Sequence, residues 1–332
     1  MFATHEDRSD LIGFGALLTG DGRTLRERVS SDADADDEIK PNIANWYDNV
    51  VFVASIIPDL AGLGLPSMVT GEVIGCFGFT EPTAGADPTT MTTFARRDGD
   101  DWVLNGAKRW IGLAILAQVA IIWATTDDGI RGFIVPTHTP GFTATAITRK
   151  LSMRASVQCD LELSEVRLPA EAILPHAMGL RGPFECLDEA RCGIIWGVMG
   201  AARDSYLAAL DYSQQRLQFG KPLAGYQLTQ QKLVDTALEI NKGMLLALQL
   251  GRLKDAGTLE PAQISIDKLN NTREATAIAR EASTILGGNG ITLDHSPLRH
   301  ADNHESVRTY QSTDEAHTLV TGNHITGIPA FR

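Results

Sequence analysis

A change of hydrophobic period near residue 180 constrains the fold of this chain more than any other feature of its sequence. From about residue 72 to 175, short runs of β type alternate with turn signals such as Asp98-Gly99-Asp100-Asp101 and Asp127-Asp128-Gly129. Beyond Pro183 the apolar residues recur with a helical period. The expected strands cover residues 92–96, 102–104, 119–124, 132–135, 142–147 and 157–163. We therefore predict a β domain followed by a helical one.

Long amphipathic helices are expected over residues 184–216, 226–256 and 261–286, with a shorter one around 314–322. Pro261 is typical of a first helical turn, and Gly257 closes the helix before it. Two further helices are expected over 11–30 and 42–63. The predicted fold class is α+β, with three parts: an N-terminal helical domain (1–70), a central β domain (71–178) and a C-terminal four-helix-type bundle (179–332).

Composition narrows the classes of function. The 332 residues are 43% hydrophobic, and a net charge of −12 without a Lys/Arg-dense stripe argues against a nucleic-acid partner. No apolar run approaches the roughly 18 residues that span a bilayer, and the first residues lack the features of a signal peptide. Four cysteines lie far apart without metal-ligand spacing: Cys76, Cys159, Cys186 and Cys192. The cysteine spacing predicts packed, reduced thiols and no metal site. Together with the lack of a long apolar run, it predicts no membrane partner and a cytoplasmic location.

Four segments combine residue types that suit ligand binding, although each alone has a simpler explanation. Residues 80–87 form a turn of small residues that would let backbone amides approach a ligand, but structural loops share that composition. Trp110 could cover a flat ring system or belong to a core. Arg216 could pair with a phosphate or with a surface carboxylate. Leu286-Gly287-Gly288-Asn289-Gly290 permits a left-handed turn and close ligand contact, or a plain helix C-cap.

Together, the order and spacing of these segments resemble the acyl-CoA dehydrogenase family, most closely its glutaryl-CoA dehydrogenase branch. The resemblance covers about 40–332 and is firm from residue 71 onward. The runs that carry it are 75–82 (GCFGFTEP), 150–156 (KLSMRAS), 182–187 (GPFECL), 251–255 (GRLKD), 308–315 (RTYQSTDE) and 325–331 (ITGIPAF). It implies an FAD-dependent oxidoreductase that dehydrogenates a CoA thioester.

The resemblance also implies which residues hold FAD. Two residues of the β domain would meet the isoalloxazine ring: Thr80 and Trp110. Three residues would reach the flavin nucleotide of a neighbouring subunit: Arg216, Phe219 and Gln227. Three more would complete that cradle: Gly287, Gly288 and Thr313. Because the family builds each flavin site from two subunits, a homotetramer made of dimers is implied.

On the substrate side, Arg191 matches an arginine near the substrate end of the site. The positions that the resemblance assigns to substrate binding are Ala86, Arg154 and Tyr310. The implied partners are an acyl-CoA ligand and an electron acceptor, either an electron-transfer flavoprotein or oxygen.

Gln311 departs from the family pattern at the position of the branch's catalytic carboxylate. An amide has no usable basicity at neutral pH, so it cannot accept the α-proton of the thioester. Three carboxylates lie nearby in the sequence. Glu189 is one residue before Ala190, which matches an alternative base position, and we expect it to be a helix-surface charge. Asp314 and Glu315 are typical of a first helical turn.

Two other departures affect ligand binding. Ala86 stands where the family commonly has Ser, which removes a polar contact worth about 1 kcal/mol. Between Leu65 and Ser67 the chain lacks roughly half of the family's N-terminal helical domain, including the residues that receive the distal carboxylate of glutaryl-CoA. The apolar surface that this domain normally covers would then need another cover.

These features leave two hypotheses. The chain is either a flavoenzyme whose dehydrogenation is impaired or redirected, for example to decarboxylation or oxygen-dependent oxidation, or a non-catalytic paralogue. The first is favoured by the complete set of flavin positions. The second, a protein that binds flavin or CoA esters or pairs with an intact subunit, is favoured by Gln311 together with the short N-terminal domain.

Overall fold

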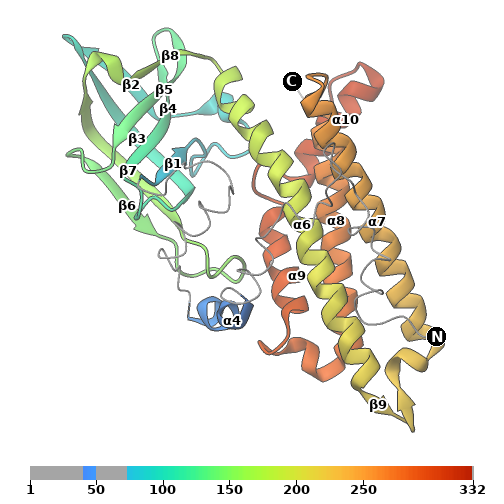
Figure 1. Cartoon of the computed structure of the whole chain (residues 1–332). Coiled ribbons are helices and arrows are strands. Elements are labelled where there is room, and N and C mark those ends of the chain that lie inside the picture. Colours follow the sequence, from blue (N-terminus) through green and yellow to red (C-terminus); the bar gives the residue numbers. More distant parts are fainter. Residues whose placement is uncertain (1–39, 50–72, 331–332) are drawn as a thin grey trace. The chain divides into compact units, whose positions relative to one another are not determined.

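The computed structural model describes residues 40–49 and 73–330, which fall into two units (Figure 1). We call Asn45–Leu187 the β unit, and we call the other unit, whose described residues are 40–44 and 188–330, the helical unit. Helix α4 (Lys40–Asp48) coincides with the start of the helix expected over 42–63. The rest of that helix, the helix expected over 11–30 and the shortening near Leu65 lie outside the described residues.

The β unit contains a mixed sheet of eight strands in the order β6-β7-β3-β2-β4-β5-β8, with β1 beside β4. Strand β4 pairs in parallel with β1 and β2, and the other pairs are antiparallel. The strands are β1 (Gly75–Gly78), β2 (Phe94–Asp98), β3 (Asp101–Gly112), β4 (Val119–Thr126), β5 (Gly129–Pro136), β6 (Phe142–Ala146), β7 (Gln158–Leu168) and β8 (Ile173–Met178). Each of the expected strands overlaps one of them.

The two predicted hairpin turns are confirmed. Asp98 pairs with Asp101 and Thr126 pairs with Gly129, and the turn glycines Gly99 and Gly129 have φ of 65° and 95°. Strands β1 and β8 were not expected. Glycines begin and end β1, and Pro175 interrupts β8, so neither shows the alternation by which strands are recognised.

A continuous apolar core underlies the long strands β3, β4, β5 and β7. Leu104, Ile122 and Phe133 are fully buried, and the Trp102 ring meets Phe133 edge-on with centroids 5.2 Å apart. The packed sheet therefore gives the loops at its ends a rigid support.

Within residues 181–330 the structure has five α-helices, of which α6 begins in the last residues of the β unit. Their bounds are α6 (Arg181–Gln215), α7 (Gln227–Asp255), α8 (Pro261–Leu286), α9 (Ser296–Val307) and α10 (Asp314–Thr326). Helix α8 has the predicted limits because Pro261 and a Glu260–Gln263 capping box begin it, while Gly287, at φ 61°, ends it. Helix α10 is a turn longer than expected and ends at Gly327 in the left-handed conformation.

The expectation of four helices in this region was wrong, because α9 was missed. Its inward residues are Pro297, Ala301, His304 and Val307, only one of which is strongly apolar. A helix that buries a histidine and a proline lacks the apolar stripe on which pattern recognition depends.

Helix α8 is the central helix of this unit and packs against α7, α9 and α10. The fully buried Asn271 joins it to two neighbours, since its Nδ2 donates to the carbonyl of Ile195 on α6 at 3.2 Å and to that of Gly243 on α7 at 2.9 Å. A side chain at Gly243 would meet Met199 and Asn271, so glycine allows these helices to approach closely.

Within the described residues, no helix is long and apolar enough to cross a membrane. All four cysteines are free thiols, but only three of them are packed as expected: Cys186 is exposed on α6.

Gly106 on β3 is expected to tolerate no side chain. Its φ is 146° and a Cβ would lie 2.6 Å from the Cα of Thr93, at an irregularity in the β3–β7 register. Gly106→Ala should therefore lower the free energy of unfolding by about 2–4 kcal/mol, from strain plus overpacking. Gly99→Ala is the control, because Gly99 also has a positive φ, of 65°, but a Cβ there meets open space. Urea denaturation of both variants tests this, and equal losses would contradict it.

Candidate active site

The turn between α9 and α10 has an unusual backbone. Gln311 and Ser312 have φ of 55° and 81°, so two successive residues with side chains adopt a left-handed conformation. Each such residue costs on the order of 1 kcal/mol, and conformations of this kind persist only where surrounding contacts impose them.

Donors from three helices hold the carbonyl oxygens of this turn. Lys268 of α8 donates from Nζ to Tyr310 at 2.8 Å and to Ser312 at 2.9 Å. The Gln311 carbonyl lies 3.0 Å from Nε of Arg191 on α6 and 3.2 Å from Nε2 of His317 on α10. Three consecutive carbonyl groups are thus satisfied by side chains.

Arg191 has further partners that fix its position. It donates to Ser312 Oγ at 2.7 Å and to Asp188 Oδ1 at 2.7 Å. The family resemblance groups Arg191 with Gln311 as catalytic positions. The structure brings Arg191, Tyr310 and Gln311 together within the helical unit.

The cations in this cluster are poorly solvated. Burial, with help from the charge of Arg191, lowers the pKa of Lys268 to about 7, although Asp314 opposes the shift. Burial and the charges of Lys268 and Arg191 lower the pKa of His317 to about 4. His317 is therefore neutral at neutral pH and can donate from Nε2 to the Gln311 carbonyl.

Of the three carboxylates that could substitute for a base at Gln311, two form ion pairs elsewhere. Asp314 accepts from Arg308 Nε at 3.0 Å and from Arg273 Nε at 3.1 Å; burial would raise its pKa, but these partners lower it. Glu189 is exposed and paired with Lys254, as expected of a helix-surface charge. Asp314 and Glu315 form the first turn of α10, which confirms that expectation.

The side chain of Gln311 itself is only partly used. Its Oε1 is buried and has no hydrogen-bond partner among the described residues. A buried amide oxygen without a donor is costly, so this atom is suited to a donor supplied by a ligand.

In the β unit, a bulge in β3 turns Trp110 outward. The β3–β7 register shifts between Lys108 and Ile111, Trp110 has φ 64°, and 52% of its surface is exposed while both of these neighbours are buried. The backbone N of Arg109 donates to the Thr80 carbonyl at 2.8 Å, which brings Thr80 and Trp110 together. Trp110 is therefore not a core residue, and its exposed ring can stack on a flat ligand.

A buried ion pair supports the Thr80 loop. Lys108 Nζ lies 2.8 Å from Glu81 Oε1 and donates to the Phe79 carbonyl at 3.1 Å, with both charged side chains almost fully buried. Glu81 also accepts from the backbone amides of Thr92 and Thr93 at 2.7 and 2.9 Å. Burial would raise the pKa of Glu81, but its hydrogen bonds from Lys108, Thr93 and Thr92 lower it to about 2.

The predicted substrate positions Ala86 and Arg154 also lie in the β unit. Ala86 is exposed on the loop before the short helix η4 (Pro88–Thr90). Arg154 donates to the carbonyls of Tyr47 at 3.0 Å and Asp48 at 2.6 Å, and its guanidinium lies over the Tyr47 ring. Its hydrogen bonds in this structure therefore go to α4.

The remaining flavin positions fall in three places of the helical unit. Arg216 and Phe219 are exposed on and beside the hairpin of β9 (Leu217–Gln218) and β10 (Lys221–Pro222), and Gln227 begins α7. Gly287 is at φ 61° and Gly288 is open to solvent, at the end of α8. Thr313 is the N-cap of α10, where its hydroxyl accepts from the Ala316 amide at 3.3 Å.

Tyr212 links the first two of these places. Its hydroxyl accepts from Asn289 of the glycine turn at 3.0 Å, and its carbonyl accepts from the Arg216 amide at 2.8 Å. The glycine turn therefore lies next to the base of the hairpin.

Lys268, His317 and the Glu81–Lys108 pair were missed by sequence reasoning. The one available signal was the position of Lys268 on the inward stripe of α8, four residues from both Ile264 and Thr272, which are buried. A lysine among inward-facing positions needs polar partners.

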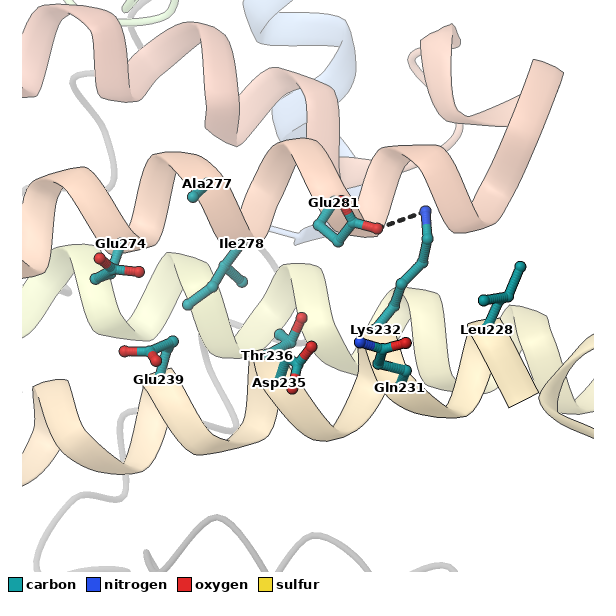
Figure 2. A pocket seen from close by; sticks show the side chains of 10 residues that line it. All are labelled: Leu228, Gln231, Lys232, Asp235, Thr236, Glu239, Glu274, Ala277, Ile278 and Glu281. Atoms are coloured by element: carbon teal, nitrogen blue, oxygen red, sulfur yellow. Dashed lines mark ion pairs between the residues drawn. The ribbon is translucent and has the colours of Figure 1, made fainter. Parts of the chain in front are cut away.

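A separate groove of about 470 Å³ lies between α7 and α8, and none of the residues predicted from the sequence lines it (Figure 2). Four carboxylates line it: Asp235, Glu239, Glu274 and Glu281. The Nζ atom of Lys232 on α7 lies 2.5 Å from Oε1 of Glu281 on α8. Burial and the neighbouring Glu239 raise the pKa of Glu274. Among the described residues, no cluster of side chains could hold a metal ion.

Comparison with known protein families shows to which family the chain belongs. The model of the acyl-CoA dehydrogenase middle domain matches residues 76–166, and that of the acyl-CoA dehydrogenase C-terminal domain matches residues 177–326. A crystal structure of glutaryl-CoA dehydrogenase from Mycobacterium smegmatis is 45% identical, with a TM-score of 0.92, covering 98% of this chain and 99% of that one. The chain belongs to the acyl-CoA dehydrogenase family.

Other relatives agree with this membership. A glutaryl-CoA dehydrogenase from M. smegmatis in complex with FADH2 is 44% identical, with a TM-score of 0.88 and coverage of 99% of this chain and 97% of that one. The human mitochondrial short-chain specific acyl-CoA dehydrogenase is 36% identical over 262 residues, which are 77% of this chain and 64% of the relative. The chain thus spans just under two thirds of the length of that curated relative.

The Glu81–Lys108 pair leads to a pH-dependent prediction. Glu81→Gln leaves a buried ammonium without its counter-charge, which should lower the free energy of unfolding by about 3–5 kcal/mol at pH 7. Because the folded pKa of Glu81 is lowered to about 2, the wild-type advantage should be complete above the ordinary glutamate pKa and shrink as the pH falls towards 2.

Denaturant unfolding of both proteins between pH 7 and pH 3 measures this difference. Glu165→Gln is the control, because Glu165 forms an exposed pair with Arg96 and should change stability little. A pH-independent difference for Glu81→Gln would contradict the assignment of an ionised, buried carboxylate.

Proposed function

We propose that this protein is an FAD-dependent oxidoreductase that binds a CoA thioester of the glutaryl-CoA type and dehydrogenates it poorly, because Gln311 replaces the base. The observation that carries the proposal is the 45% identity to a glutaryl-CoA dehydrogenase over nearly the whole of both chains. The turn at Gln311 supports the proposed slow dehydrogenation. Side chains hold the backbone of this turn through its carbonyl groups, but the side chain of Gln311 has no acid–base group.

The residues present fit a bound flavin. The exposed Trp110 ring offers an aromatic face beside Thr80, and the turn at Gly287 and Gly288 has no Cβ to keep a ligand from the backbone. Exposed Arg216 beside it offers a planar cation that suits a phosphate. When bound, FAD accepts the hydride that leaves the β-carbon of the thioester.

The chain's own task is to remove the α-proton in the same reaction. Residue 311 sits where that proton would be taken, but an amide cannot accept it. Two carboxylates that could replace it are engaged elsewhere, because Asp314 is held by two arginines and Glu189 by Lys254. A substrate whose α-proton is already acidic, or one that loses carboxylate, would need this base less.

The second candidate is a binding protein without turnover. It is favoured by the unpaired Oε1 of Gln311, which would accept a hydrogen bond from a ligand without taking a proton from it. Such a protein would retain flavin and thioester affinity, alone or beside an intact subunit.

Gln311→Glu should restore the missing step. A carboxylate at this position supplies the general base, whose absence costs on the order of 10²–10⁴ in rate, so anaerobic flavin bleaching by glutaryl-CoA should accelerate by about that factor. Gln311→Met is the control, because methionine has a similar volume but no group that can accept a proton. A flavin-replete Gln311→Glu protein that is not reduced would show that position 311 is not what limits the reaction.

We also propose that the protein is a cytoplasmic homotetramer that transfers electrons to an electron-transfer flavoprotein or to oxygen. The oligomer is supported by two exposed apolar surfaces. Phe219 is 96% exposed at the tip of the β9–β10 hairpin, and α7 exposes Val234, Leu238 and Leu245 at helical spacing. A neighbouring subunit would cover both and receive the hairpin near its flavin.

Arg216→Ala should lower flavin content and oligomer mass together, because Arg216 would hold the flavin of a neighbouring subunit. Flavin absorbance per chain and light scattering after gel filtration measure the two quantities. Arg280→Ala is the control, since Arg280 forms a surface pair with Glu305. A flavin-replete Arg216→Ala protein of unchanged mass would overturn the assignment.

A further inference from the structure

Lys268 is the least expected charged residue of the helical unit. Only 1% of its surface is exposed, and no carboxylate among the described residues lies within ion-pair distance of it. Its ammonium instead donates to two backbone carbonyls, those of Tyr310 at 2.8 Å and Ser312 at 2.9 Å. These are the residues on either side of Gln311.

The segment between those carbonyls is the one that needs support. Gln311 and Ser312 both have positive φ, which residues with a side chain adopt unfavourably. A donor that binds the carbonyls before and after Gln311 selects this conformation, because a change of φ at 311 or 312 would move those carbonyls apart.

We propose that Lys268 is the positioning residue for position 311: its buried side chain clamps the two flanking carbonyls and so fixes the left-handed turn that aims the side chain at 311. The functional part of this inference rests on the proposed function, in which residue 311 faces the acyl chain. Arg191 and His317 complete the clamp by binding the Gln311 carbonyl itself.

The clamp does not depend on one protonation state. The charged groups facing Lys268 are Arg191 from α6 and Asp314 from α10, and His317, also from α10, is neutral at neutral pH. An ammonium has three N–H bonds and a neutral amine has two, so either form can bind both carbonyls. The turn therefore keeps its shape on both sides of neutral pH.

The first test measures chemistry in the Gln311→Glu background. Adding Lys268→Met removes the donors at nearly constant volume and should slow anaerobic flavin reduction by glutaryl-CoA by about 10²-fold, the scale of a misplaced reacting group. The Kd for the thioester should change far less, because the residue acts on placement and not on binding. Lys242→Met, which breaks a surface pair with Glu239, is the matched control. An unchanged reduction rate in the Lys268→Met protein would overturn the proposal.

The second test asks whether the loss is specific to the turn. Glycine adopts positive φ without cost, so Ser312→Gly should recover part of the rate lost in Lys268→Met, whereas a general packing defect would not be relieved there. Absence of any recovery, with both proteins folded, would assign Lys268 to packing and reject the positioning role.

The third test separates this inference from the proposed function. With Gln311 in place, hydrogen–deuterium exchange of peptides covering 306–318 should accelerate in Lys268→Met and not in Lys242→Met. If Gln311→Glu shows no flavin reduction, the proposed function fails, and this exchange result alone decides the positioning role. If Lys268→Met does not fold, Lys268→Arg is used, because a planar guanidinium cannot reproduce the clamp. Hydrogen–deuterium exchange at the wild-type rate in Lys268→Arg would overturn the positioning role.

Discussion

The hydrogen bonds from the Lys268 side chain to the turn at Gln311 are the interaction on which the candidate site depends. They join the central helix of the helical unit to a segment in which two successive residues with side chains have positive φ. Burying an amine is unfavourable, and that cost is offset here by the two backbone carbonyls that accept its hydrogen bonds.

The β unit uses the same arrangement. Lys108 is buried and binds the Phe79 carbonyl next to the predicted flavin contact Thr80, with Glu81 as its counter-charge. Lys150 donates in the same way to the carbonyls of Met153, another positive-φ residue, and Ser156. A lysine suits this task because its flexible stem crosses apolar packing and its head offers several donors. Loops that carry predicted site residues in both units are thus held by side-chain hydrogen bonds and not by regular secondary structure.

Under the proposed function, this arrangement would allow a family scaffold to retain its site while its activity changes. The backbone of the turn at 310–312 is held through carbonyl groups, which every residue type possesses. If Gln311 replaces a carboxylate, as we propose, the substitution leaves these backbone hydrogen bonds available and changes the chemistry of the side chain at this position. In that proposal its cost falls on catalysis more than on stability.

Local signals in the sequence determined the elements: the change of period near residue 180, the turn glycines Gly99 and Gly129, and the limits of α8 between Pro261 and Gly287. Motif order determined the family, and it predicts the flavin and substrate positions. Tertiary structure alone decided that Lys268 and Arg191 meet the turn, because these residues lie 42 and 120 positions from their partners. It also decided the left-handed backbone at Gln311 and the inward face of α9. No local propensity encodes such features, since they exist only when distant helices supply the hydrogen bonds and burial that offset their cost.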